Sequence, residues 1–130
     1  MRPELRKVIY ARLTGTGGAG VGDRVYMMQA PDAAALPYAV ISPVVLGKTN
    51  QQPRDAIREM WQIDCWGSSW AAAETVYQAV VASMAASKLT IAGWSVWWQE
   101  LMDTRTFVEN VAGKQYFRYM AEFDIRASKN

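Results

Sequence analysis

The residue types that most often carry out chemistry are scarce in this sequence of 130 residues. It contains no histidine and a single cysteine, Cys65. Without histidine the chain lacks the usual general base, the commonest metal ligand and both the Ser-His and the Cys-His nucleophile pairs. Cys65 has the apolar neighbours Ile63 and Trp66, and a buried cysteine of this kind is usually an inert small hydrophobe. The sequence therefore predicts no catalytic residue.

Two other patterns bear on cofactors and metals. Residues 15–20 match the G-x-G-x-x-G motif, which binds dinucleotides when it follows a strand and opens a helix. Here the motif follows a predicted helix and precedes a predicted strand, so we interpret it as a helix exit and predict no cofactor. No cysteine pair or acidic cluster has the spacing of a zinc or magnesium site, which predicts no metal.

Carboxylates are the remaining candidates for acid and base chemistry. No argument from spacing brings two of them into one cleft, so we interpret them as solvated charges on strand faces. The six considered are Glu59, Asp64, Glu100, Asp103, Glu109 and Glu122.

Three tryptophans within five residues, Trp94, Trp97 and Trp98, form the most unusual feature of the chain. On a regular strand Trp94 and Trp98 share one face and Trp97 takes the other, so something must cover at least one face. Three interpretations remain open: packing inside the domain, an interface with another subunit, or a platform on which bases or sugars stack.

Composition limits the partners and the location. The net charge of +2 is too small to imply a nucleic-acid or membrane partner. The N-terminus has charge but no apolar segment typical of a signal peptide, and a lone cysteine fits a reducing compartment. Residues 36–47 form the longest near-apolar stretch, which is shorter than the roughly 20 residues of a membrane-spanning helix.

Hydrophobic periodicity predicts the elements of the first half. Apolar residues four apart predict a short amphipathic helix over residues 4–13, which glycines end. Strands are predicted over residues 23–28 and 38–48, where Pro43 implies an edge position or a bulge. The polar segment 47–55 is predicted to be an exposed loop, mobile in the isolated protein. Two interpretations remain open: a loop that orders on docking, or a solvated connector that contacts nothing.

The middle of the chain combines a strand and a helix. Alternation from residue 57 predicts a half-buried strand, in which Glu59 shares the apolar face and Asp64 lies on the other. Ser68 or Ser69 is predicted to cap the main helix, whose apolar residues recur at helical spacing as far as about Lys88.

The last third is predicted to be extended. Residues 94–102 and 106–111 have strand character, a turn follows at residues 112–114, and residues 117–126 alternate as a strand with one face on a core and one in solvent. The chain thus reads as a single domain, residues 1–130, of the α+β class: a mainly antiparallel sheet packed against a long central helix and a short N-terminal helix.

This succession of elements resembles the tail completion proteins of long-tailed bacteriophages, a family that includes tail terminators and head-to-tail joining proteins. The resemblance spans nearly the whole chain. It is carried by the N-terminal helix with Leu5, Ile9 and Leu13, and by residues 23–26, 30–31, 36–41, 62–66, 73–74 and 122–125.

The resemblance implies a structural protein without enzymatic activity. It implies a protomer that assembles, in a hexameric ring, on the end of the tail tube, stops tube growth and presents a surface to the head connector. The implied partners are further copies of the chain, the tail tube protein and head completion proteins, and the implied location is the virion tail, reached from the host cytoplasm.

The residues favoured for assembly contacts are the tryptophans and the polar loop. They are Gln51, Gln52, Arg54, Asp55, Trp94, Trp97 and Trp98. The alternative function is a small module that binds a ligand or single-stranded nucleic acid on the tryptophan-bearing strand. A terminator and a head-to-tail joining protein are not distinguished by these residues.

Overall fold

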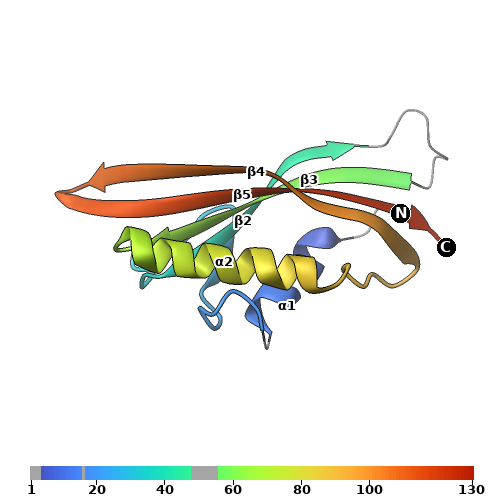
Figure 1. The fold of residues 1–130 in the computed structure, drawn as a ribbon, viewed down its shortest axis with the longest axis horizontal. Coiled ribbons are helices and arrows are strands. Elements are labelled where there is room, and N and C mark those ends of the chain that lie inside the picture. The colour runs from blue at the N-terminus through green and yellow to red at the C-terminus, as the bar shows by residue number, and fades with distance from the viewer. Residues whose placement is uncertain (1–3, 16, 48–55) are drawn as a thin grey trace.

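The computed structural model describes residues 4–15, 17–47 and 56–130. In these ranges two helices lie on the same face of one sheet (Figure 1). The elements are α1 (Leu5–Thr14), β1 (Val25–Met27), β2 (Tyr38–Gly47), β3 (Ala56–Gly67), α2 (Trp70–Ala86), β4 (Trp94–Val111) and β5 (Lys114–Lys129). The strand order is β1-β2-β3-β5-β4, with β1 parallel to β2 and every other neighbouring pair antiparallel.

The predicted fold class is wrong, because the chain forms mostly a sheet. β4 and β5 have 18 and 16 residues, whereas α1 has 10 and α2 has 17. α2 is no long central helix: it ends at Ala86 and packs mainly on β3 and β5. The sequence pattern underestimated the strands because β4 is continuous where two separate extended segments were predicted. The parallel pair of β1 and β2 makes the sheet mixed.

The core lies between the sheet and the two helices. Alternate residues of β3 and β5 point toward the helices, as the sequence predicted, and side chains of α1 and α2 pack against them. Leu5, Ile9, Leu13, Ile63, Cys65, Val76, Val80, Ala121, Phe123 and Ile125 are all at most 3% exposed. Each fully buried Leu, Ile, Val or Phe side chain contributes about 1.5–3 kcal/mol of hydrophobic stabilisation.

A close backbone approach places α2 against the end of β3. A Cβ atom on Gly67 would lie 2.5 Å from the backbone nitrogen of Ala73, so only glycine fits there. The predicted cap is confirmed at Ser69, whose hydroxyl accepts a hydrogen bond of 3.1 Å from the backbone nitrogen of Ala72.

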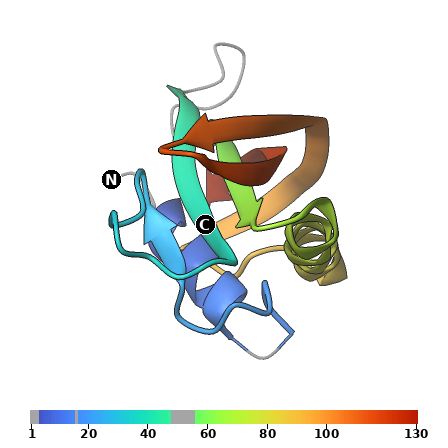
Figure 2. The same ribbon diagram turned by 90° about the vertical axis from the view of Figure 1, so that its left-hand side faces the viewer.

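The second face of the sheet was predicted to be solvated, and this is wrong for its centre. Asp64, Met120 and Asp124 point away from the helices but are 6%, 5% and 0% exposed. The sheet is strongly curved, with the β4–β5 hairpin arching beside β3 (Figure 2). On this face Arg58 and Arg126 contact Asp124, and Arg118 contacts Asp64. The outer face therefore has a partly buried polar layer of its own.

Candidate assembly interface

β4 is the open edge of the sheet. Among the described strands it pairs only with β5, so one side of its 18-residue backbone carries unpaired donors and acceptors, a template for pairing with another chain. Its exposed large apolar side chains are Trp97, Trp98, Met102, Phe107, Val108 and Val111, each 37–54% exposed. β4 therefore offers backbone hydrogen bonds and apolar surface along the same line.

The three tryptophans do not alternate as predicted, because a register shift interrupts β4 just before Trp98. Trp94 packs against the helix-side core, whereas Trp98 lies opposite Arg126 on the outer face. Trp97, at the bulge, donates a hydrogen bond of 3.1 Å from its indole nitrogen to the hydroxyl of Ser128. The guanidinium of Arg126 lies 5.9 Å and 5.3 Å from the ring centres of Trp97 and Trp98. The bulge thus gathers both exposed tryptophans around one arginine.

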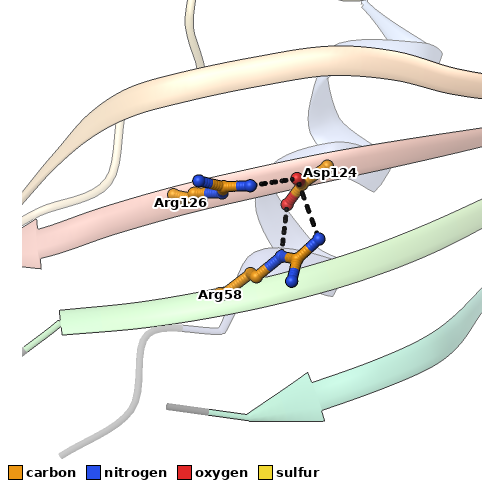
Figure 3. A network of polar contacts seen from close by, with 3 residues as sticks. All are labelled: Arg58, Asp124 and Arg126. Atoms are coloured by element: carbon orange, nitrogen blue, oxygen red, sulfur yellow. Dashed lines mark hydrogen bonds and ion pairs between the residues drawn. The ribbon is translucent and has the colours of Figure 1, made fainter. Parts of the chain in front are cut away.

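A buried carboxylate holds that arginine in place (Figure 3). Asp124 accepts a hydrogen bond of 3.0 Å from Nη2 of Arg126 and bonds of 3.3 Å and 3.4 Å from Nε and Nη2 of Arg58. The side chain of Asp124 is 0% exposed, and the two guanidinium groups supply the opposite charge that such a buried carboxylate requires. We call Trp97, Trp98, Arg126, Asp124 and Arg58 the tryptophan patch.

Sequence reasoning missed the charged members of this patch. Arg58, Asp124 and Arg126 fall on the parity that was assigned to solvent. The signal that could have found them is the order of charges on the final strand, where an aspartate two residues before an arginine puts both on one face.

Two further carboxylates are buried, against the prediction that they are solvated. Glu59 is 2% exposed and accepts a hydrogen bond of 2.9 Å from the indole nitrogen of Trp61. Asp64 accepts a bond of 2.9 Å from the amide of Gln62 and lies 3.4 Å from Nη1 of Arg118. Burial raises the pKa of Asp64 above its usual range, despite these bonds that favour the ionised form. Glu59 and Asp64 are therefore buried residues that make polar contacts within the sheet.

Cys65 lies in the core with 0% of its surface exposed, which confirms the predicted burial. Burial, and secondarily the nearby charge of Asp64, raises the pKa of its thiol far above the usual range. A thiol held in this state supplies almost no thiolate, the reactive form of cysteine.

Gln51, Gln52, Arg54 and Asp55 lie outside the described residues. Residues 15–20 connect α1 to β1, the predicted context, which differs from the strand-to-helix turn of a dinucleotide site. Over ranges 4–15, 17–47 and 56–130 there is no group of three or more potential metal ligands. No helix within those ranges is long and apolar enough to cross a membrane.

Comparison with known families decides what kind of protein presents this surface. The profile of the family described as "Tail completion protein gp17" matches residues 7–128, nearly the whole chain. The chain belongs to this family. The resemblance inferred from the sequence is thereby confirmed, and this tail completion protein has the role of a structural protein of phage tails.

A solved structure has the same fold. A chain of the "Virion of native gene transfer agent (GTA) particle" superposes on the tail completion protein with a TM-score of 0.75 at 18% sequence identity, over 95% of this chain and 94% of that chain. At this identity the likeness concerns the fold. No curated protein sequence matches the chain significantly.

Proposed function

We propose that this tail completion protein forms a ring, of six copies, on the end of the tail tube. The ring stops tube growth and presents the surface to which the head connector joins. Subunits are made in the host cytoplasm and end in the virion tail, and the protein acts through contacts without catalysing a reaction. The observation that carries the proposal, beyond family membership, is the open edge of β4 with the tryptophan patch beside it.

The tryptophan patch has the composition of an interface centre. Trp97 and Trp98 are 39% and 40% exposed, and their side chains are large enough to anchor a contact. Contacts with Arg126 and Ser128 already hold these side chains in place. Tryptophan and arginine are the residue types most enriched among residues that dominate binding energy. Because these side chains are ordered before binding, little rotamer entropy is lost when a partner covers them.

Each subunit of a ring needs two different surfaces. The first surface of one subunit contacts the second surface of the next subunit. The two margins of the sheet are β4 on one side and β1 with β2 on the other. The second margin has its own exposed apolar side chains, Met28 at 64% and Val44 at 46%. We place the β4 margin of one subunit against the β1–β2 margin of its neighbour, an arrangement that closes a ring without leaving either margin free.

The polar segment with Gln51, Gln52, Arg54 and Asp55 is assigned a role in assembly on the basis of its residue types. Its side chains offer hydrogen-bond donors and acceptors to a neighbouring subunit or to the tail tube protein. We assign them to contacts that form on docking.

Mass measurement in solution tests the ring, with and without tail tubes. We expect the wild-type protein to assemble into rings on tube ends. We expect the Trp97→Ala/Trp98→Ala variant to need an at least about tenfold higher concentration to assemble, since each anchor contributes about 1–2 kcal/mol to the contact between subunits. Tyr10→Ala is the matched control, because Tyr10 is 38% exposed but lies on α1.

Two results would contradict the ring. One is a strictly monomeric protein both in solution and with tail tubes present. The other is binding of a single-stranded oligonucleotide that weakens strongly with salt and disappears in the double variant, which would favour a stacking platform for nucleic acid.

A further inference from the structure

A row of aromatic side chains crosses the outer face of the sheet at the end away from the tryptophan patch. Tyr26 of β1 packs edge-on against Tyr38 of β2 at 5.7 Å, and Tyr38 lies 6.1 Å from Trp66 of β3. The guanidinium of Arg118 on β5 continues the row, 5.2 Å from the Trp66 ring and 4.3 Å from that of Phe107 on β4. Side chains from all five strands therefore hold one another in a fixed line.

Two cavities share the wall formed by Tyr38 and Trp66. One, of about 200 Å³, is bounded also by Asp32, Glu109 and Tyr116. The other, of about 280 Å³, is bounded also by Met28, Asp64 and Arg118. Two neighbouring hollows on one aromatic wall suit an extended polypeptide, which places successive outward side chains at regular intervals.

The charge of these cavities is negative. Their lining carries three carboxylates, Asp32, Asp64 and Glu109, against the single guanidinium of Arg118. Arg118 is already bound to two of them, at 3.4 Å from Asp64 and 3.3 Å from Glu109. Asp32 belongs to an exposed loop, and the side chain of Glu109 is 43% exposed, so both carboxylates remain accessible to a ligand.

We propose that this pair of cavities binds an extended basic segment of a partner protein. An arginine or lysine side chain of that segment lies against the rings of Trp66 and Tyr116 and pairs with Glu109 and Asp32. Aromatic faces attract cations, and a carboxylate beside them adds charge-assisted hydrogen bonds. A phosphate backbone fits badly, because three carboxylates repel it.

This site lies apart from the tryptophan patch, although Met28 of the β1–β2 margin also bounds its second cavity. Arg118 and Arg126 lie eight residues apart on β5, about 26 Å at the rise of a strand. The inference goes beyond the proposed ring because it assigns a basic segment as a further partner, and it rests on the aromatic row and the charge of the cavities.

Titration with a defined peptide tests the site in the intact protein. The probe is acetyl-Gly-Arg-Pro-Gly-amide, compared with the same peptide carrying Gln in place of Arg. The readout is the indole N–H signal of Trp66 in a nitrogen-15 spectrum, identified as the signal that Trp66→Phe removes. We expect the arginine peptide to shift this signal in a saturable way and to bind at least about fivefold more tightly than the glutamine peptide.

Charge-removing variants locate the binding. Asp32→Asn/Glu109→Gln is expected to weaken the arginine peptide about threefold to tenfold while leaving the glutamine peptide unchanged. Glu100→Gln, an exposed carboxylate of β4 near the tryptophan patch, is the control and should bind as the wild type does. The proposal is overturned if Trp66 does not respond, if the two peptides bind equally, or if Glu100→Gln weakens binding as much as the double variant.

Discussion

Asp124 and Arg126 lie two residues apart on β5, and a 3.0 Å hydrogen bond joins them on the outer face of the sheet. The side chain of Asp124 is 0% exposed and that of Arg126 is 30% exposed. A buried carboxylate is tolerated only with such compensation, so the pair fixes Arg126 in position. Because Arg126 in turn contacts Trp97 and Trp98, the order of the exposed tryptophans depends on Asp124, a residue that is itself buried.

Replacing that carboxylate by its neutral isostere should therefore loosen the tryptophan patch. Asp124→Asn is expected to lower the free energy of unfolding by about 1–3 kcal/mol, because two guanidinium groups lose the charge that they share. Urea denaturation measures this change, and near-ultraviolet circular dichroism reports the order of the tryptophans. Glu100→Gln, opposite Asp124 on β4 and exposed, should change stability by less than about 0.5 kcal/mol. Equal effects of the two variants would refute the anchoring role.

Asp64 should make stability depend on pH in a defined direction. Burial raises its pKa in the folded state above the ordinary value of an aspartate in the unfolded chain, so folding is favoured when Asp64 is protonated. Relative to Asp64→Asn, the wild type should be most stable below that value and should lose stability as the pH rises through the raised pKa. Unfolding free energies of both proteins between pH 3 and pH 8 measure the difference. A difference that grows in favour of the wild type with rising pH would show that the Arg118 contact outweighs burial.

Cys65 should be chemically silent in the native protein. Because its thiol is buried and its pKa is raised, thiolate reagents should not label it at pH 8, and labelling should become complete in denaturant. The labelling rate measured with and without urea tests this. Rapid native labelling would show that the thiol is accessible and that the core around β3 opens.

Elements with a regular period could be predicted from the sequence. The N-terminal helix, the capped second helix and the alternating strand from residue 57 were found within a few residues of their bounds, because each presents one apolar face to a single core. Pro43 was assigned an edge position or a bulge, and β2 indeed shifts register between Pro43 and Val45.

What sequence reasoning missed follows from irregular backbone and from sheet curvature. β4 has register shifts before Trp98 and before Asp103, and each shift exchanges the faces of all later residues. The alternation of apolar and polar residues is therefore interrupted, and the sequence does not indicate one long strand. Burial of Asp64 and Asp124 depends on the curved outer face and on partners from neighbouring strands. A period within one segment carries no information about these distant contacts.

Shortening the polar segment tests its proposed contacts. Replacing residues 49–54 with a short Gly-Ser turn should leave the melting temperature nearly unchanged, because the replaced residues are polar apart from Pro53. Tail completion, measured as the yield of tails joined to heads, should be blocked. If the shortened protein still gives head-joined tails of normal length, the segment is only a connector.

The length of tails measured by electron microscopy tests whether this protein ends growth of the tail tube. Cells that lack the gene for this protein should make overlong, headless tails, and the wild-type gene should restore a single length and head joining. The Trp97→Ala/Trp98→Ala variant, shown to be folded by its melting temperature, should leave tails overlong. The Tyr10→Ala variant should restore the normal tail length. Tails of normal length joined to heads in the absence of the protein would show that it does not stop tube growth.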